Sequence, residues 1–336
     1  MQELPYAHGT PPLAARLRSM PEDFQVEEIL GYDADGSGEH ALLWVEKRGA
    51  NTDWVARELA KFAGVPPVAV GYAGLKDRHA VTRQMFSVQL AGKPDPDWSA
   101  FPHADVKVLA ATRHARKLKR GALRGNRFVL VLREVAGDRA AAEQVLTQIA
   151  ARGVPNYFGE QRFGREGGNV AQARAMFGGR RVDRDQRSFL LSAARSHIFN
   201  AVLAARVGRV AWDTPLDGEI WSLAGSRSWF GPEPFTDVLA ERLARADIHP
   251  SGPLWGQGEP PATGEAGALE REVAAANDDL AAGLAAARME QERRPLRLLP
   301  KDLHWRWLDD DALELSFELP AGTYATVVVR ELASTL

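Results

Sequence analysis

The sequence predicts an α+β fold in which a sheet-based domain is interrupted by an inserted, mostly helical one. The first observation is length, because 336 residues exceed the usual size of one hydrophobic core and favour two domains. The second is a change of pattern, from strand-like alternation up to about residue 135 to Ala-rich helical stretches between residues 138 and 287. The third is a return to strand-like alternation from residue 313. An inserted domain produces this order of strands, helices and strands.

The N-terminal part combines one expected helix with several expected strands. Residues 51–62 have an amphipathic helical pattern, with Asn51 or Thr52 as the N-cap and Gly64 as the stop signal. Residues 68–72 form a short apolar run that is typical of a buried strand. The alternating segments that we expect to form strands are 24–30, 41–45, 84–90, 105–112 and 126–135.

The rest of the chain is expected to be helical until its last 25 residues or so. A stretch rich in glycine and proline, 249–267, predicts a long loop within the inserted domain. Alternation predicts two final strands, at 313–319 and 323–332. The expected helices are 138–153, 168–177, 188–207 and 267–287.

The composition is that of an ordinary folded protein, with 45% hydrophobic and 26% charged residues. The N-terminus lacks the apolar core of a signal peptide, and no later segment is long and apolar enough for a membrane span. We therefore expect a cytoplasmic protein without a membrane partner. The absence of cysteine excludes disulfides, thiolate nucleophiles and Cys-based zinc sites.

Common catalytic motifs are also absent from the sequence. It contains no G-x-x-x-x-G-K-[ST], no H-E-x-x-H and no G-x-S-x-G. Nucleotide hydrolysis, zinc-dependent proteolysis and the serine-hydrolase mechanism therefore have no support. We expect no metal and no other cofactor.

The charge distribution favours a nucleic-acid partner, although the net charge is only −2. Residues 113–127 contain seven Lys or Arg and no acid, and residues 162–187 contain seven Arg and three acids. Residues 259–292 offset this charge with eight acids and two Arg. A basic loop with glycines suits a phosphate backbone, and we expect Lys117 and Lys119 to contact RNA phosphates. The alternative is a solvated surface loop.

The segment GYAGLKDRHAVTRQ, residues 71–84, contains the main candidate for catalysis. It places Asp77 between Lys76 and Arg78, just after the apolar run 68–72, and loops at strand ends often contain catalytic residues. Taken alone, such an acid is typical of an exposed turn. His79 is likewise more typical of a structural hydrogen bond than of a general base.

Aromatic residues occur beside basic ones in further segments. Together, aromatic rings and cations form a surface on which an unpaired base stacks while its phosphates are held. A single aromatic residue is more often part of the core. The segments are PEDFQVEE at 21–28, GNRF at 125–128, PNYFGEQRFG at 155–164 and LPAGTYATVVVREL at 319–332.

Taken together, these segments resemble the TruD family of tRNA pseudouridine synthases. The family's order is followed by PEDFQVEE, KRGANT, YAGLKDRHAVTRQ, GNRF, PNYFGEQRFGREGGN and LPAGTYATVVVREL, from residue 21 to residue 332. The resemblance implies a pseudouridine synthase catalytic domain, built on a mixed, largely antiparallel sheet from residues 1–152 and 301–336. It also implies an inserted TRUD-type domain of mostly helical α+β structure over residues 153–300.

The resemblance implies isomerisation of uridine to pseudouridine in tRNA, at position 13 of the D-arm, without a cofactor. Asp77 aligns with the family's nucleophile, and its carboxylate attacks C1′, adds to C6 of the ring, or promotes a glycal route. Since desolvation disfavours an ionised carboxylate beneath a base, a cation must face it. That cation is Lys76, Arg78 or a basic residue from elsewhere in the chain.

The same resemblance implies the substrate pocket. Phe128 is expected to stack on the flipped uracil, with Phe24, Asn126 and the residue at 324 lining the pocket. The chain has Tyr324 where we expect Phe, which keeps the ring and adds a hydroxyl. Arg162 is expected to support the site or to contact phosphate.

Two other functions are compatible with these features. A non-catalytic RNA-binding or tRNA-folding protein would use the same basic and aromatic surface without needing Asp77. A pseudouridine synthase acting mainly on another RNA is the second alternative. In every case RNA is the expected partner, and no obligate protein partner is indicated.

Overall fold

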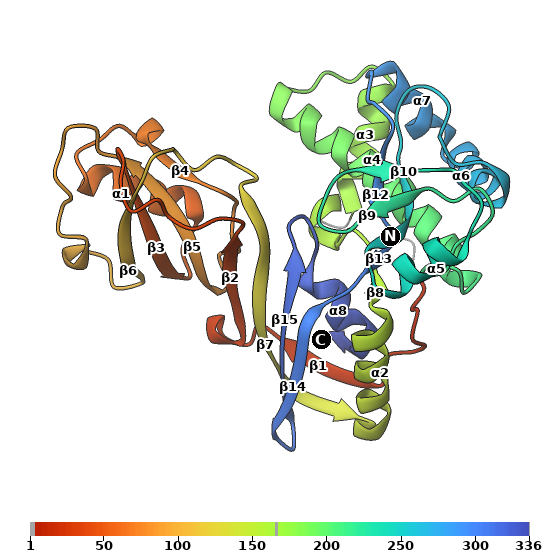
Figure 1. The fold of residues 1–336 in the computed structure, drawn as a ribbon, viewed down its shortest axis with the longest axis horizontal. Helices are drawn as coiled ribbons and strands as arrows, with labels where there is room; N and C mark the ends of the chain where they lie inside the picture. The colour runs from red at the N-terminus through yellow and green to blue at the C-terminus, as the bar shows by residue number, and fades with distance from the viewer. Residues whose placement is uncertain (1–3, 165–166, 336) are drawn as a thin grey trace. The chain divides into compact units, whose positions relative to one another are not determined.

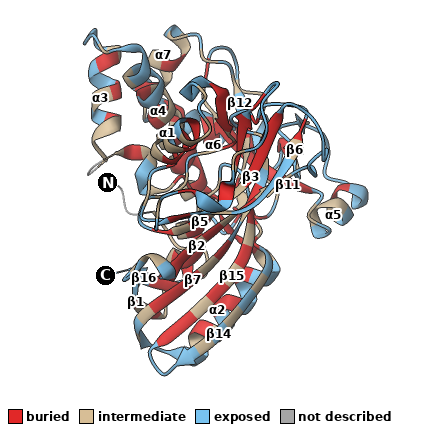
Figure 2. Cartoon of the chain, turned by 90° about the vertical axis from the view of Figure 1, so that its left-hand side faces the viewer, coloured by how far each residue is buried: buried red, intermediate tan, exposed pale blue. Residues whose placement is uncertain are grey.

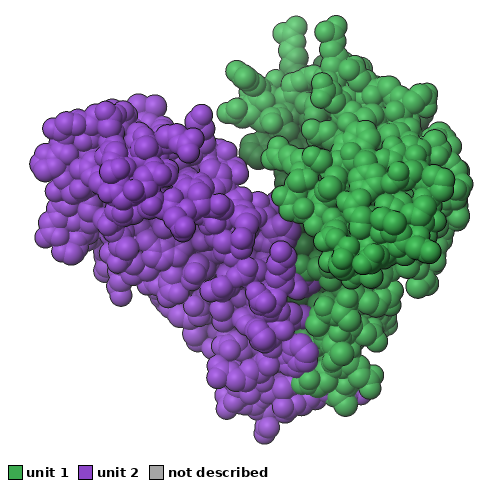
Figure 3. Space-filling view, in the orientation of Figure 1, with its two compact units in different colours: residues 1–11, 140–299, 323–332 green, residues 12–139, 300–322, 333–336 purple. Residues whose placement is uncertain are grey.

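The computed structural model describes residues 4–164 and 167–335, whose helices and strands are labelled in Figure 1. Residues 165 and 166, within the segment PNYFGEQRFGREGGN that carries part of the family resemblance, lie outside the described residues. The chain forms two compact units, coloured in Figure 3. Unit 1, which we call the helical unit, comprises Met1–Pro11, Ala140–Leu299 and Thr323–Leu332. Unit 2, the sheet unit, comprises Pro12–Arg139, Pro300–Gly322 and Ala333–Leu336.

These units divide the chain differently from the predicted domains. Contacts group residues 1–11, 140–152 and 323–332 with the helical unit, whereas the sequence assigned them to the catalytic domain. The difference arises because compact units follow packing, and these three segments pack on residues 153–299. The catalytic and inserted domains themselves stay a prediction.

The sheet unit contains a mixed, largely antiparallel sheet of ten strands, as predicted. Only the pairs β2·β5 and β1·β16 are parallel among the described strands. Three short strands lie beside the main path: β1 (Leu13–Leu17) pairs with β7 and with β16 (Ala333–Thr335), and β4 (Val70–Tyr72) pairs with β5. The main path runs through β14 (Lys301–Asp309), β15 (Ala312–Pro320), β7 (Leu123–Gly137), β2 (Phe24–Leu30), β5 (Val81–Gln89), β3 (His40–Arg48) and β6 (Val106–His114).

Alternating burial along the strands separates a packed face from a more open one. In β2, Phe24, Val26 and Glu28 are buried, whereas the residues between them are partly exposed. Figure 2 shows the same alternation along β7 and β15. The one α-helix among the described residues of this unit is α1 (Thr52–Phe62), which follows the predicted cap Asn51 and packs apolar residues against β3 and β5. Gly64, the predicted stop signal, has a φ of +61° that favours glycine.

The helical unit has the mostly helical α+β composition that was predicted. Its described α-helices are α2 (Arg139–Arg152), α3 (Gly168–Phe177), α4 (Arg184–Gly208), α5 (Asp237–Ala244), α6 (Gly264–Ala275), α7 (Asp278–Ala286) and α8 (Ala325–Leu332). An antiparallel sheet runs β10 (Trp229–Phe230), β9 (Trp221–Leu223), β11 (Ile248–Leu254), β12 (Glu292–Pro295). A separate pair joins β8 (Val154–Pro155) to β13 (Arg297–Leu298).

The prediction of a strand over residues 323–332 was wrong, because most of this segment is the helix α8. Its β-branched residues favour a strand locally. Its apolar residues nevertheless recur at helical spacing, and Ala325, Val328, Val329 and Leu332 are all buried. The buried Glu331 accepts a hydrogen bond from the Ala7 N–H at 2.8 Å. Tertiary packing therefore overrides the local preference.

The prediction of one long loop over residues 249–267 was also wrong. Residues 248–254 form β11, which lies between β9 and β12 although it contains Pro250 and Pro253. The Pro250 carbonyl accepts a bond from the Leu296 N–H at 2.9 Å, so this proline takes part in pairing through its acceptor. The segment ends inside α6, which begins at Gly264.

Short 3-10 helices connect several elements, at Pro21–Asp23, Pro67–Ala69, Trp98–Ala100 and Glu160–Phe163. Within residues 4–164 and 167–335, none of the helices combines the length and the apolar character that crossing a membrane requires.

Candidate active site

One face of the sheet unit brings together residues from five strands. The register aligns Lys47 with Thr82, Thr82 with Val26, Val26 with Phe128, and Phe128 with Phe317. Residues that are directly opposite in neighbouring strands project from the same face. This row therefore forms the floor on which the loop after β4, which contains Asp77, is placed.

Buried polar side chains fix the backbone of the Asp77 loop. The Gln84 Nε2 donates to the Gly74 carbonyl at 3.2 Å, and the Lys76 N–H donates to the Thr52 Oγ1 at 3.0 Å. The Lys47 Nζ donates to the Asp77 carbonyl at 3.0 Å. Gln84, Thr52 and Lys47 are each at least 98% buried, so the loop rests on a rigid base.

The cation that faces Asp77 is Arg18, which comes from the end of β1. Its Nη2 donates to the Asp77 Oδ2 at 2.7 Å, and the exposed fractions of the two side chains are 27% and 42%. The guanidinium carbon of Arg18 also lies 4.0 Å from the centroid of the Phe24 ring. Arg18 has a φ of +63°, a strained value for a side chain of this size. The backbone therefore bends out of its preferred range where the guanidinium is held between ring and carboxylate.

Lys76 and Arg78, the two sequence neighbours of Asp77, contact other groups. The Lys76 Nζ lies 2.8 Å from the Glu28 Oε1, and both side chains are almost fully buried. Arg78 is exposed, and its Nε donates to the Gly49 carbonyl at 3.3 Å. The sequence left Lys76, Arg78 or a basic residue from elsewhere in the chain as the cation that faces Asp77. In the structure this cation is Arg18, which comes from elsewhere in the chain.

Lys47 is a buried cation that we did not predict from the sequence. Its side chain has no exposed surface, and its Nζ donates to the carbonyls of Ala50 at 2.7 Å and Asp77 at 3.0 Å. Burial lowers the pKa of Lys47 to about 8, with the charge of Asp77 acting against this shift and that of Lys76 adding to it. The sequence does contain a signal for the burial of Lys47, because residue 47 continues the alternation of the buried Leu43 and Val45.

Phe24, Phe128 and Asn126 share the face on which the loop is placed. Phe128 packs edge-to-face on Phe24, with centroids 6.3 Å apart, and lies 5.7 Å from the ring of Phe317. It is 7% exposed, so a small part of its ring is open to a ligand. The Asn126 Oδ1 is buried and accepts no hydrogen bond from the described residues, which leaves a hydrogen-bond acceptor beside Phe128.

Tyr324 and Arg162 lie together in the helical unit, whereas Asp77, Phe24 and Phe128 belong to the sheet unit. The Arg162 Nη2 donates to the Tyr324 hydroxyl at 3.0 Å, and its Nη1 donates to the Ser192 Oγ at 2.9 Å. The hydroxyl that distinguishes this residue from the expected Phe thus has a partner. Phe158 packs edge-to-face on Tyr324 with centroids 6.4 Å apart.

Arg294 adds a second cation to this cluster and was not predicted. Its guanidinium carbon lies 4.1 Å from the centroid of the Phe158 ring, and its Nη2 donates to the Asn156 Oδ1 at 2.7 Å. Burial lowers the pKa of Arg294 to about 10, and the nearby charge of Arg162 adds to this effect. Arg294 therefore remains a cation at neutral pH.

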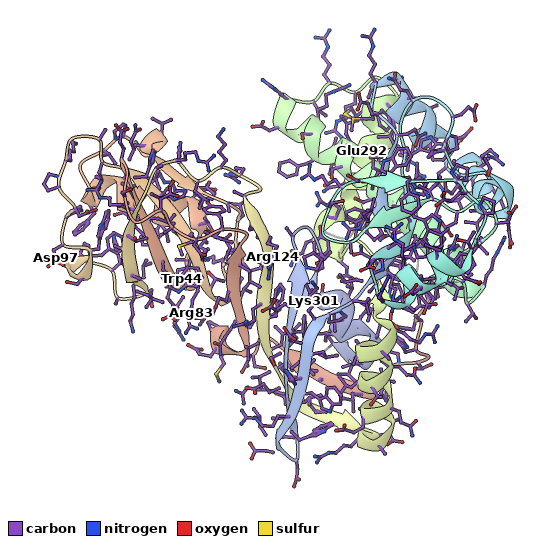
Figure 4. All side chains as sticks on the ribbon, in the orientation of Figure 1. Trp44, Arg83, Asp97, Arg124, Glu292 and Lys301 are labelled. Atoms are coloured by element: carbon purple, nitrogen blue, oxygen red, sulfur yellow. The ribbon has the colours of Figure 1, made fainter. Side chains whose placement is uncertain are left out.

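The basic loop, residues 113–127, packs against the segment that leads to Asp77. The Gly121 N–H donates to the Ala73 carbonyl at 2.7 Å. Lys117 and Lys119 are exposed, and the Lys117 Nζ donates to the Val68 carbonyl at 2.5 Å. Figure 4 labels Arg124, which lies near the start of β7, the strand that also contains Asn126 and Phe128. The basic loop and the Asp77 loop thus belong to one packed region.

A search of residues 4–164 and 167–335 finds no group of three His, Cys, Asp or Glu side chains arranged to hold a metal ion. Lys47, Lys76, Gln84 and Arg18 each pair with a carboxylate or with the backbone, whereas the Asn126 Oδ1 accepts no hydrogen bond from the described residues. They position a carboxylate, cations, an amide and aromatic rings, which is the chemistry needed to bind a polar planar base above an acid.

Comparisons with known proteins connect this arrangement to one family. A family model described as tRNA pseudouridine synthase D (TruD) matches residues 2–173 and 169–332. A tRNA pseudouridine synthase D from Xanthomonas campestris pv. campestris (strain 8004) is 57% identical over 348 residues, covering 99% of this chain and 95% of that protein. The tRNA pseudouridine synthase D of Methylococcus capsulatus is 50% identical over 332 residues, covering 98% and 94%.

A solved structure has the same fold. It is assigned as tRNA pseudouridine synthase D (TruD) from Methanosarcina mazei, and it matches with a TM-score of 0.74 at 21% identity. The match covers 97% of this chain and 95% of the other, so the likeness extends over both units.

Proposed function

Because the chain belongs to the TruD family of tRNA pseudouridine synthases, we propose that it isomerises uridine to pseudouridine in tRNA with Asp77 as the nucleophile. The observation that carries this proposal is the contact of the Asp77 carboxylate with Arg18 at 2.7 Å, beside the ring of Phe24. A half-exposed acid held by a cation next to aromatic rings suits attack on a nucleoside that stacks there.

The reaction needs one carboxylate and no co-reactant. The bond between C1′ and N1 of uridine breaks, the uracil turns, and a bond between C1′ and C5 forms. The hydrogen on C5 then leaves as a proton and N1 takes up a proton, so the product is an isomer and no electrons are gained or lost. Attack of Asp77 on C1′, its addition to C6 and proton removal on a glycal route all need an ionised acid beside the nucleoside.

Arg18 and Lys47 have different tasks in this proposal. Arg18 contacts the carboxylate itself, so its charge offsets part of the desolvation cost when a base covers Asp77 and excludes water. Lys47 acts through the backbone, because its Nζ holds the Asp77 carbonyl and the Ala50 carbonyl together from the buried side. We therefore treat Lys47 as a positioning residue.

Base recognition follows from the residues beside Asp77. A uridine that leaves its stack loses a few kcal/mol, and stacking on an aromatic ring recovers about 1–3 kcal/mol. We assign this stacking to Phe128, with Phe24 as its neighbour. The buried Asn126 Oδ1 lacks a donor among the described residues, and the N3–H of uracil is a donor of matching chemistry.

We assign the target to position 13 of the D-arm, as in the family. Lys117 and Lys119 are exposed on the loop that packs against the Asp77 segment. We assign to them the phosphates next to the target uridine. Tyr324, Arg162 and Arg294 form a paired aromatic and cationic group, which suits contact with the sugar, base or phosphate of the same tRNA.

Two tRNA transcripts test this function, one with uridine and one with cytidine at position 13. Chemical mapping of pseudouridine after incubation with the purified protein, without added cofactor, should find it at position 13 of the first transcript alone. Modification elsewhere would contradict the assigned position. Tight binding of both transcripts without modification would favour an RNA-binding or tRNA-folding protein.

A further inference from the structure

We propose that Tyr32, stacked on His114 where the basic loop begins, is a second base-binding platform that holds an unpaired nucleotide of the tRNA. The inference rests on the proposed function for the identity of the RNA. It adds a binding site outside the pocket of Asp77 and Phe128. The nucleotide bound there is one that leaves its own stack close to the target uridine.

The geometry is that of an open aromatic stack. The rings of Tyr32 and His114 are 5.4 Å apart with an interplanar angle of 18°. His114 is 4% exposed, whereas Tyr32 is 41% exposed, so Tyr32 keeps much of its surface open to solvent while it stacks on His114. A base that stacks on the open side of Tyr32 would complete a three-layer stack.

The platform is rigid before any ligand arrives. The Asp35 Oδ2 lies 2.8 Å from the His114 Nδ1 and accepts a bond from the Ala115 N–H at 2.9 Å. At Gly38, φ is +123° and an added Cβ would lie 2.5 Å from the His114 carbonyl oxygen, so the two loops touch backbone to backbone. A ring held in this way loses little conformational freedom when a base stacks on it.

Cations that follow His114 along the chain favour a nucleotide as the ligand of the platform. Burial raises the pKa of the Tyr32 phenol, the charge of Arg116 acts against this shift, and the charges of Glu28 and Asp35 add to it. Arg116 is exposed, and Lys117 and Lys119 follow it on the basic loop. A base needs the ring and a phosphate needs the cations, so a nucleotide satisfies both.

The platform also lies close to the Asp77 loop. The Glu28 carboxylate acts on the Tyr32 phenol, and the same carboxylate pairs with Lys76, the residue before Asp77. The basic loop donates a hydrogen bond from Gly121 to the Ala73 carbonyl, four residues before Asp77. A nucleotide on Tyr32 therefore belongs to the same region of the RNA as the target uridine.

Three variants of Tyr32 separate stacking from packing. Tyr32→Ala removes the ring, Tyr32→Leu keeps an apolar side chain on His114 without a planar surface, and Tyr32→Phe keeps the ring. For the transcript that the parent modifies, we expect KM to rise about five- to 150-fold for Ala and Leu, since that range corresponds to one stacked base. With Phe, KM should stay within about twofold of the parent, and kcat should change little in all three.

Equilibrium binding tests the platform independently of the chemistry. The same Tyr32 variants are placed in an Asp77→Asn background, and the Kd for the transcript is measured without turnover. A Kd that rises for Ala and Leu but not for Phe supports the platform, even if the parent proves to have no synthase activity. A Kd that is unchanged for Ala and Leu, with the fold intact by circular dichroism, overturns it. A rise that Tyr32→Phe shares equally also overturns it, because the ring would then not be the binding element.

Discussion

Replacing Arg18 by Met should lower the activity by removing the cation that faces Asp77. The side chain of Met keeps an apolar body against Phe24, where the Arg18 guanidinium now lies 4.0 Å from the ring centroid. The change therefore removes charge and hydrogen bonding from the Asp77 Oδ2 while it keeps much of the packing.

The size of the effect follows from the distance between the charges and from their exposure. For charge centres about 4 Å apart, the attraction is about 1 kcal/mol in water and about 4 kcal/mol at an effective dielectric constant near 20. Since the Asp77 side chain is 42% exposed, screening places the free protein near the lower value. A bound base excludes water and moves the value upward. We expect kcat/KM to fall by about five- to a thousandfold.

The assay is the rate of tritium release from tRNA labelled at C5 of uridine, measured at several tRNA concentrations. Arg18→Lys should recover part of the loss, because an ammonium restores the charge but not the planar stack on Phe24. Arg16→Met is a matched control, since Arg16 lies on the same strand and pairs with Glu134 at the exposed surface. It should leave kcat/KM within about twofold of the parent.

One result would refute this reasoning. If Arg18→Met has the kcat/KM of the parent and an unchanged fold, the ion pair does not support the ionised form of Asp77 during the reaction. Another cation would then have to face the carboxylate in the complex with RNA.

Three further predictions concern the floor of the site and the basic loop. Burial lowers the pKa of Lys47 from 10.5 to about 8, so between these pH values the unfolded chain binds more protons than the folded chain. The free energy of unfolding should therefore rise with pH in this range, by up to about 3 kcal/mol relative to Lys47→Met. Denaturant titrations at pH 7 and pH 9.5 that show a constant difference between the two proteins would contradict this. Phe128→Leu should lower kcat/KM about five- to 150-fold by loss of stacking, and an unchanged kcat/KM would contradict the stacking role of this ring. Replacing Lys117 and Lys119 by Gln should reduce the slope of log K against log salt by about 1.4 to 1.8, as measured by filter binding, and an unchanged slope would mean that neither contacts phosphate.

Local patterns identified the parts of the site that are close together in the sequence. The alternation in β7 placed a strand that carries both Asn126 and Phe128. The run 68–72 placed the Asp77 loop after a strand, but only Val70–Tyr72 form that strand, and Val68 is exposed in a 3-10 helix. The mixed sheet also followed from the family resemblance. Such features depend on periodicity and on short segments, which a single sequence contains in full.

The contacts that were missed join residues that are far apart in the sequence. Arg18 and Asp77 are separated by 59 residues, and Arg162 and Tyr324 by 162. Each pair depends on which strands or helices become neighbours, which periodicity does not specify. The helix α8 was missed for a related reason, because the burial of its apolar face, and not its β-branched composition, decides its structure.

The central claim is that Asp77 is essential for isomerisation, and tritium release from C5-labelled tRNA tests it most directly. The substrate is tRNA from cells that lack the modification, and the purified protein is compared with Asp77→Asn, which keeps the size of the side chain. C5 loses its hydrogen when it becomes the glycosidic carbon, so we predict release by the parent and none above background by the variant. Equal release by the two proteins would contradict the role of Asp77, and no release by either would contradict the synthase activity itself.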